Sequence, residues 1–409
     1  MRNKKKIIRA ATVSQSCNFF REVMIKLRDD KYHMIALSSP GKQLTDLQKE
    51  GFKIIEVPME RHISIKNDIK SLYRLLIAFV KEKPYVVHSI TPKAGLLCMI
   101  AAYLTRVPVR IHTFTGLVWP TASGLQKLIL KTTDRITCFC ATHINPEGYG
   151  ILNDLKKGRI TRKKMKVLGY GNIQGIDLYR FSKRPELQEK IKEVNNESSF
   201  TFLFVGRIVG DKGINELVEA FCRLYEERPE VRLNLVGFFE ENLDPVRPET
   251  KKRIEECPGI IAAGERNGDD LVAEYAAADC FVFPSYREGF PNTVLEAGAM
   301  GLPSIVTDIN GSREIITDIA HAERDKTTDD TDRHGNLKTK NQKLKTKTNG
   351  IIIPPKDAEA LYEAMKLMVT DDGMREAMAR NARPMIESRF EQGFVRQCLY
   401  DFYEDILDS

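Results

Sequence analysis

Residues 200–236, FTFLFVGRIVGDKGINELVEAFCRLYEERPEVRLNLV, decide the fold class. They begin with the apolar run Phe200–Val205, typical of a buried strand, and end with a second such run at Val231–Val236. Between these runs, Asn215–Glu227 carries apolar residues at helical spacing. Because two parallel strands need a crossover connection, this order predicts a strand-helix-strand unit in a parallel sheet.

The same alternation of short apolar runs and amphipathic stretches occurs on both sides of this unit. Further strands are expected at Ile7–Val13, His33–Leu37, Lys53–Val57, Tyr85–Ser89, Val109–Phe114, Ile136–Cys140, Lys166–Tyr170, Cys280–Pro284 and Ser304–Thr307. Further helices are expected at Asp68–Val80, Leu96–Leu104 and Thr293–Met300, and a terminal helix follows Phe390. The pattern predicts an α/β protein with helices on both faces of its sheets.

A chain of 409 residues exceeds what one hydrophobic core usually organises. We therefore expect a first domain at 1–182, a polar linker at 183–199, a second domain at 200–385 and a terminal helix at 386–409. Both domains read as doubly wound, so a ligand is expected in the cleft where the carboxyl ends of the two sheets meet.

The net charge of +7 hides an asymmetry between the two halves of the chain. Residues 1–180 hold 32 Lys and Arg against 13 Asp and Glu. A basic half suits nucleic acid, an anionic membrane surface or a phosphate-bearing substrate, and charge alone does not choose among them. The apolar run Ala94–Leu104 is too short to span a bilayer, and the N-terminus does not resemble a signal peptide, so a cytoplasmic protein is expected.

The polar stretch His321–Thr348 cannot bury enough apolar surface to order itself, so we interpret it as an exposed, mobile insertion. It has no aromatic residues for base stacking, and we expect no nucleic-acid partner. Its Asp330-Thr331-Asp332 motif and the isolated pair Cys138 and Cys140 are weak signals for a metal, and no metal site is predicted.

Gly206-Arg207-Ile208-Val209-Gly210-Asp211-Lys212-Gly213 follows the strand Phe200–Val205. The two terminal glycines permit a tight backbone, while Arg207 and Lys212 place two cations where a diphosphate would lie. The pattern is neither a P-loop nor a GxGxxG turn. An ordinary turn with surface salt bridges is the alternative.

Residues 285–303, SYREGFPNTVLEAGAMGLP, place Glu288 in a loop and Glu296 about two helical turns later. Two carboxylates at this spacing can face one cleft, and the free backbone N–H groups at the helix entry can hold hydroxyl or phosphate oxygens. In the alternative interpretation Glu288 caps the helix and Glu296 is solvated.

In the basic half, His88 and Lys93 lie around a Ser-Ile-Thr-Pro turn just after a strand, where Lys93 suits a phosphate. A plain surface position is equally compatible with both residues. The helix Asp68–Lys81 carries an apolar stripe that fits either a membrane surface or packing on its own sheet. The stripe consists of Leu72, Leu75, Leu76, Phe79 and Val80.

The R-x4-K-G and E-x7-E patterns, followed by GLPSIVTDINGSREII and GIIIPP, resemble the retaining family-4 glycosyltransferases of the GT-B fold. HSITPKAGLL, VPVRIHTFTG and GNIQGIDLYRF are similar to motifs of members that build bacterial surface polysaccharides. The resemblance implies two Rossmann-like domains, with the terminal helix crossing back to the first. It covers most of the chain.

The resemblance also implies site residues. Arg207 and Lys212 would bind the donor diphosphate, and Glu288 would lie beside the donor sugar as the third catalytic residue. The donor-binding set would be Gly206, Glu265, Arg266, Gly289, Phe290, Pro291, Asn292, Thr293 and Glu296. Glu296 would bind the ribose hydroxyls, and no metal or cofactor would be required.

The acceptor side departs from the family pattern. Thr115 stands where many relatives have a histidine before the glycine, and His112 lies three residues earlier. Which of the two acts at the reactive centre, or whether either does, stays open, and a structural histidine at the strand end is an equal alternative for His112. His88 and Lys93 complete the acceptor-side set. Val13-Ser14-Gln15-Ser16 replaces a Gly-Gly turn.

The activity implied is retaining transfer of a sugar from a nucleotide-diphosphate sugar, with UDP expected, to a glycan on a lipid carrier in capsule, lipopolysaccharide O-antigen or exopolysaccharide synthesis. The enzyme would act at the inner face of the cytoplasmic membrane, bound to its anionic surface. The alternatives are a nucleotide-sugar epimerase or hydrolase of the same fold, and a catalytically silent binding partner.

Overall fold

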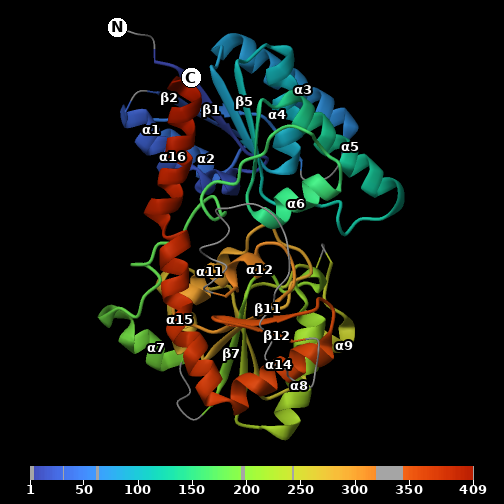
Figure 1. Cartoon of the computed structure of the whole chain (residues 1–409), viewed down its shortest axis with the longest axis vertical. Coiled ribbons are helices and arrows are strands. Elements are labelled where there is room, and N and C mark those ends of the chain that lie inside the picture. Colours follow the sequence, from blue (N-terminus) through green and yellow to red (C-terminus); the bar gives the residue numbers. More distant parts are fainter. Residues whose placement is uncertain are drawn as a thin grey trace. The chain divides into compact units, whose positions relative to one another are not determined.

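The computed structural model describes residues 4–30, 32–60, 64–194, 199–241, 244–318 and 344–408. They form two compact units (Figure 1). The first contains the described residues up to Gly175 and from Gly393 onward, and the second runs from Ile176 to Gln392.

The first unit is built on a six-stranded parallel sheet in the order β3-β2-β1-β4-β5-β6. Its strands are β1 (Lys6–Ala10), β2 (His33–Ser38), β3 (Lys53–Glu56), β4 (Val86–Ile90), β5 (Val109–Phe114) and β6 (His143–Pro146). Except for the edge strand β3, these strands are almost entirely buried, as parallel strands covered by helices on both faces require. Because they are all parallel, their carboxyl ends lie at one edge of the sheet.

Helices cover both faces of this first sheet. One core packs α3 (Ile65–Glu82), α4 (Pro92–Leu104), α5 (Gly124–Cys140) and α6 (Tyr149–Lys157) on one face. The other core packs α1 (Arg21–Asp30), α2 (Lys42–Lys49) and α16 (Gln392–Asp408) on the opposite face. The last helix of the chain therefore belongs to the first unit.

The second unit repeats the design with seven strands in the order β12-β13-β11-β10-β7-β8-β9. Its strands are β7 (Thr201–Val205), β8 (Arg232–Val236), β9 (Ile260–Gly264), β10 (Cys280–Phe283), β11 (Ser304–Thr307), β12 (Lys345–Lys347) and β13 (Gly350–Ile353). All neighbouring pairs are parallel except β12 with β13. Its helices are α7 (Gln188–Val194), α8 (Ile214–Glu227), α9 (Pro248–Glu256), α10 (Gly268–Ala277), α11 (Asn292–Ala299), α12 (Ser312–Ile315), α14 (Ala358–Thr370) and α15 (Asp372–Phe390).

The expected α/β fold with two doubly wound parallel sheets is confirmed, but two of the expected strands are wrong. Ile136–Cys140 is the last part of α5, where Lys163 Nζ donates to the carbonyl oxygens of Cys138, Phe139 and Ala141. The short apolar run is helical because it continues a 17-residue helix, a context that a five-residue window does not contain.

Lys166–Tyr170 is also not a strand. Only Met165 next to it forms an isolated bridge, to Ile144 in β6. Strands β6, β9, β12 and β13 are not among the expected strands. All four are only three to five residues long, and β6 and β12 also lack a run of apolar residues.

The chain passes from one unit to the other at positions that differ from the expected domain boundaries. The expected linker 183–199 includes α7, which packs on α10 of the second unit, and Arg184 Nη2 bonds Asp269 Oδ1 over 2.6 Å. The expected terminal helix 386–409 is divided at Glu391, between α15 and α16. The chain enters the second unit at Ile176 and leaves it just after Glu391, and these two residues pair as an isolated parallel bridge.

Most of the stretch His321–Thr348, including Asp330-Thr331-Asp332, lies outside the described residues. Its last residues, Lys345–Lys347, form β12 at the sheet edge, so the insertion ends in ordered structure. Among the described helices, none combines the length and the apolar character needed to cross a membrane.

Candidate functional site

The loops that follow the parallel strands of the second unit meet at one edge of its sheet. Gly206–Gly213 follows β7, Glu265 and Arg266 follow β9, and Ser285–Gly289 lies after β10. Because β10, β7, β8 and β9 are neighbours in that order, the carboxyl-end loops bring the predicted cations and acids to the same edge.

The loop after β7 depends on close backbone packing. Gly213 has φ +73°, and a Cβ atom there would lie 2.2 Å from the carbonyl oxygen of Pro284. Only glycine fits, since both the conformation and the space exclude a side chain. The loop is thereby held against the end of β10, and α8 begins at Ile214 directly after it.

Lys212 and Glu288 form an ion pair between the loops after β7 and β10. Both side chains are largely removed from solvent, each being 16% exposed. The ammonium group also lies 5.4 Å from the centre of the Phe283 ring. Arg207 is half-buried and makes no side-chain hydrogen bond or ion pair with any residue in the described ranges. Of the two predicted diphosphate cations, Lys212 is therefore neutralised and Arg207 has no such partner among the described residues.

Ser285 orients the carboxylate of Glu288. Its Oγ donates to Glu288 Oε1 over 2.8 Å, and the backbone N–H of Tyr286 donates to the carbonyl oxygen of Asp211 over 2.8 Å. These bonds join the two loops. Glu288 does not cap α11, because the N-cap position is Pro291 and has no side-chain hydrogen bond. The capping alternative for Glu288 is therefore wrong.

The entry to α11 is packed closely against the loop after β11. A Cβ atom on Gly311 would lie 2.6 Å from the carbonyl oxygen of Gly289 and 2.7 Å from Cα of Phe290. The Phe290 ring points into the protein and packs on Phe390 with ring centroids 5.3 Å apart. Phe290 can therefore serve a ligand only through its backbone. Asn292 and Thr293, the first residues of α11, remain partly accessible.

Glu296 lies one turn further along α11 and is not a solvated surface acid. The phenol of Tyr275, on α10, donates to its Oε2 over 2.8 Å. Burial raises the pKa of Glu296 to about 7, although the Tyr275 hydrogen bond acts in the opposite direction. The carboxylate is thus held in place and close to its titration point at neutral pH.

Glu265 and Arg266 are exposed at the end of β9. Arg266 Nε lies 3.5 Å from Oε1 of the buried Glu274, and Asn267 Nδ2 lies 3.5 Å from Oε1 of Glu265. The strand order places them beyond β8, two strands away from the Lys212 loop.

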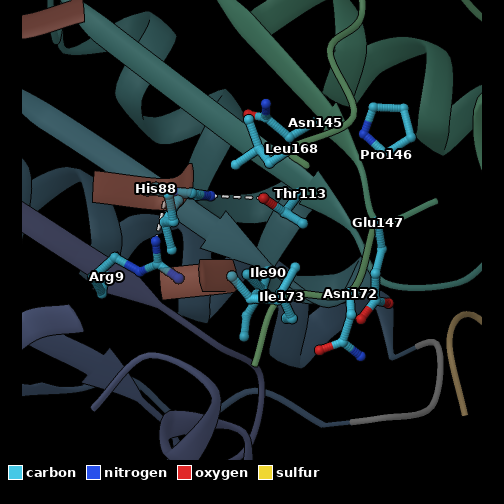
Figure 2. A pocket seen from close by; sticks show the side chains of 12 residues that line it. Arg9, His88, Ile90, Thr113, Asn145, Pro146, Glu147, Leu168, Asn172 and Ile173 are labelled. Atoms are coloured by element: carbon cyan, nitrogen blue, oxygen red, sulfur yellow. Dashed lines mark hydrogen bonds between the residues drawn. The ribbon is translucent and has the colours of Figure 1, made fainter. Parts of the chain in front are cut away.

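In the first unit, His88 is buried inside β4 and does not lie in the turn after it. Arg9 Nη1 donates to His88 Nδ1 over 2.7 Å, and His88 Nε2 lies 2.8 Å from Thr113 Oγ1 (Figure 2). The hydroxyl of Tyr403, on α16, contacts both Arg9 and His88. The surface alternative for His88 is wrong.

The contacts of His88 determine its protonation. A guanidinium group can only donate, so Nδ1 must accept, and the ring proton is on Nε2 and is donated to Thr113. Burial and the charge of Arg9 lower the pKa of His88 well below its ordinary value. Beside this cluster is a cavity of about 20 Å³, enough for a water molecule, which Asn145 and Glu147 also line (Figure 2).

The remaining acceptor-side residues differ in accessibility. His112 is buried in β5 against Gly95 and within 2.9 Å of Ser89 Oγ, and burial lowers its pKa to about 3. Lys93, in the first turn of α4, forms an ion pair with Asp68 at 2.7 Å. Thr115 follows β5 and is partly exposed.

Sequence reasoning missed several residues that orient the site. Ser285 and Tyr275 hold the two glutamates, and Arg9 and Tyr403 hold His88. Ser285 begins the motif that contains Glu288 and was within reach. Tyr275, Arg9 and Tyr403 have no local signal, because each meets its partner only through the tertiary fold.

A family model described as "Glycosyl transferases group 1" matches residues 199–371. This range contains Arg207, Lys212, Glu288 and Glu296.

Curated relatives match over nearly the whole chain. The capsular polysaccharide biosynthesis glycosyltransferase CapM of Staphylococcus aureus is 30% identical over 409 residues, covering all of this chain and 98% of its own. An Escherichia coli enzyme named as UDP-Gal:alpha-D-GlcNAc-diphosphoundecaprenol alpha-1,3-galactosyltransferase is 27% identical, covering 93% of this chain and 91% of its own.

The fold has close counterparts among solved structures. The Anabaena protein HepE, solved in complex with UDP, superimposes with a TM-score of 0.74 at 16% identity, covering 98% of this chain and all of HepE. At this identity the likeness concerns the fold.

Proposed function

The chain belongs to the group 1 glycosyl transferases, and from this premise we propose that it moves a sugar from a nucleotide-diphosphate donor to a lipid-linked glycan. The observation that carries the proposal is the gathering of Arg207, Lys212, Glu288 and Glu296 at one edge of the second sheet. Two cations and two acids at the carboxyl ends of parallel strands suit a diphosphate with a sugar on each side.

Arg207 and Lys212 take the diphosphate in this proposal. Their positive charges stabilise the leaving diphosphate as the glycosidic bond breaks, so that no metal is needed for that task. Lys212 is neutralised by Glu288 before the donor arrives, and the half-buried Arg207 offers its charge directly. Turnover that is unchanged by EDTA would support this assignment, and complete loss that Mg²⁺ restores would refute it.

Glu296 accepts hydrogen bonds from the ribose hydroxyls, and Glu288 lies beside the donor sugar. Gly206, Gly289, Phe290, Pro291, Asn292 and Thr293 complete the donor pocket, with Glu265 and Arg266 near the base. UDP is the proposed nucleotide. Competition of UDP, GDP and ADP in calorimetry tests that choice.

We propose retention of anomeric configuration without a covalent nucleophile. Glu288 Oε1 is engaged by both Lys212 and Ser285, which disfavours it as a free nucleophile. In a front-face reaction the donor phosphate oxygen takes the acceptor proton as the new bond forms. NMR of the product anomeric proton, compared with the donor sugar, would contradict this proposal if the configuration were inverted.

On the acceptor side, Thr115 is the better candidate for the reactive centre, because His112 is buried and uncharged. His88 orients Thr113, two residues before Thr115, and Lys93 meets an acceptor phosphate by exchanging it for Asp68. Thr115→Val should lower kcat, whereas His112 variants should act mainly on stability.

The acceptor proposed is a saccharide on a diphosphate lipid carrier, used in capsule, O-antigen or exopolysaccharide synthesis at the inner face of the cytoplasmic membrane. The relatives described above are named as transferases, which favours transfer over epimerisation, hydrolysis or a silent binding role. Incubation with UDP-sugars and no acceptor separates these activities, because a transferase leaves the donor largely intact.

Alanine variants of the two cations test the central assignment. Arg207→Ala and Lys212→Ala should each lower kcat on the order of 100-fold. Arg223→Ala is the matched control, since Arg223 lies on α8 in an exposed ion pair with Glu359. Wild-type rates for both loop variants would overturn the assignment.

A further inference from the structure

The large exposed apolar side chains of the first unit are concentrated on one layer of three helices. Figure 1 shows α3, α4 and α5 together on one side of the first sheet, and α3 and α5 both pack on α4. We call the outer side of these helices the α3–α5 surface. Its exposed apolar residues are Ile65, Ile69, Tyr73, Ile77, Val80, Tyr103, Leu104, Leu125, Leu128, Ile129, Ile136 and Phe139.

Helix α3 has two apolar stripes, and its own sheet accounts for only one. Leu75 and Phe79 are buried in the core of the unit, and Leu72 and Leu76 pack against that core. The stripe Leu72–Val80, for which a membrane surface and the unit's own sheet were both open, therefore packs on the sheet, apart from Val80. The outward stripe repeats every fourth residue at Ile65, Ile69, Tyr73 and Ile77, which are 51–74% exposed. Residues four apart lie on one face of a helix, so these side chains form a continuous ridge.

Positive charge strongly outweighs negative charge on these three helices. The acids within them are Asp68, Glu82 and Asp134. Asp68 pairs with Lys93, and the buried Glu82 pairs with Lys6 and Lys53. Burial raises the pKa of Asp134 to about 7, while Trp119 Nε1 donates to it over 3.0 Å.

The exposed basic residues next to this ridge have no such partner among the described residues. Lys66, Lys70, Arg74 and Lys81 on α3 form no ion pair with any residue in the described ranges. The surface is therefore both apolar and positively charged. Its acids Asp68 and Glu82 are neutralised by ion pairs, and Asp134 by its raised pKa.

A groove at the end of α5 combines the same two properties. Ile136, Phe139 and Ile160 supply its apolar wall, and Arg135, Arg159 and Arg162 line it with guanidinium groups. These six residues are the α5 groove. Its open volume is about 660 Å³, and Arg135 and Arg162 make no ion pair with a described residue. Guanidinium groups next to an apolar wall fit a phosphate with a hydrocarbon chain attached.

We propose that the α3–α5 surface docks onto an anionic phospholipid bilayer, with lipid phosphates in the α5 groove and the α3 ridge in the headgroup region. A bilayer offers apolar chains and a layer of negative charge at once, which matches a surface that presents apolar side chains among unpaired cations. The inference deepens the proposed function by locating the surface that would face a lipid-linked acceptor. Only this link to the acceptor rests on the proposed function.

Vesicle sedimentation of the full chain tests the proposal. Binding to vesicles of phosphatidylcholine with 30% phosphatidylglycerol should greatly exceed binding to pure phosphatidylcholine, and high salt should weaken it. Changing Arg135, Arg159 and Arg162 together to Gln should reduce binding on the order of 100-fold. Ile69→Ser with Ile77→Ser should reduce it at least tenfold.

Matched controls come from the second unit. Ile261→Ser removes an apolar side chain that is 46% exposed, and Arg223→Gln removes an exposed cation. Both should bind vesicles like the wild type. Equal binding by all variants, or no wild-type binding, would overturn the proposal. So would a dimer in light scattering that the Ile69 and Ile77 changes dissociate, since the surface would then contact a second copy.

The experiments distinguish failure of the docking surface from failure of the proposed function. UDP binding should be the same in the ridge, groove and control variants. If wild-type protein binds vesicles but not nucleotides, the donor assignment fails and the docking surface stands. If it binds UDP but not vesicles, the docking surface fails alone.

Discussion

Tyr275 donates a 2.8 Å hydrogen bond to Oε2 of Glu296, joining α10 to the helix that carries the second acid of the site. The bond orients the carboxylate, while burial holds its pKa at about 7 instead of near 4.5. The unliganded protein thus holds a carboxyl group in an unfavourable environment, where ribose hydroxyls would satisfy it.

This environment predicts that Glu296→Gln stabilises the unliganded protein at alkaline pH. A folded-state pKa above the ordinary value means that stability is highest at acid pH and falls as pH rises from about 4.5 to 7. The variant lacks this loss, so its gain should be about 3 kcal/mol at pH 8 and less than about 1 kcal/mol at pH 5. Thermal unfolding at both pH values measures it. An equal effect at the two pH values would contradict the assigned pKa.

The Lys212–Glu288 ion pair predicts opposite effects on binding and turnover. Glu288→Gln frees Lys212 and removes a negative charge beside the diphosphate, so UDP should bind about three- to tenfold more tightly. Turnover should fall, because the carboxylate next to the donor sugar is lost. Calorimetry and initial rates separate the two effects, with Glu359→Gln as the control, since Glu359 is an acid in an exposed ion pair with Arg223 outside the donor site. Weaker UDP binding by Glu288→Gln would refute the pairing argument.

Replacing either of two glycines at positive φ with alanine should lower the stability by very different amounts. Gly213→Ala places Cβ 2.2 Å from the Pro284 carbonyl oxygen, whereas Gly264→Ala, at φ +71°, meets nothing within 4 Å. Conformational strain alone costs about 1 kcal/mol, so Gly264→Ala should stay near that value. Gly213→Ala should cost more than about 3 kcal/mol and abolish nucleotide binding. Chemical denaturation of both variants provides the comparison.

His88 predicts a measurable loss of stability in mild acid. Its folded pKa lies well below 6.5, so below pH 6.5 the unfolded chain takes up a proton that the folded chain refuses. His112, with a pKa of about 3, behaves in the same way. Each contributes a slope of up to about 1.4 kcal/mol per pH unit.

His88→Gln should remove one of these two slopes. A glutamine can still accept from Arg9 and donate to Thr113, which keeps the hydrogen-bond pattern. Stability measured between pH 5 and 6.5 should fall less steeply in the variant than in the wild type. An unchanged slope would mean that His88 is protonated in the folded protein.

Much of the fold follows from local sequence. Strand Val109–Phe114 and strand Ser304–Thr307 have the expected bounds, and α8 starts one residue before the expected helix. These segments are continuous apolar runs or clear amphipathic helices, whose periodicity is visible in a short window. Ile136–Cys140 fails because a run of five residues does not distinguish a strand from the end of a long helix.

The main residues of the donor-site hypothesis could also be selected from the sequence. Arg207, Lys212, Glu288 and Glu296 stand in motifs next to strand ends, and parallel strands bring such ends together. The burial of His88 was not predictable, since its Arg9 and Tyr403 partners lie 79 and 315 positions away.

The order of apolar and polar residues by itself determined two parallel sheets and the edge that carries the cations and acids, because backbone periodicity and strand direction are local properties. Only the tertiary structure decided which groups are charged, buried or held. Desolvation and hydrogen bonding depend on neighbours that are distant in the chain, as Tyr275 is for Glu296 and Arg9 is for His88.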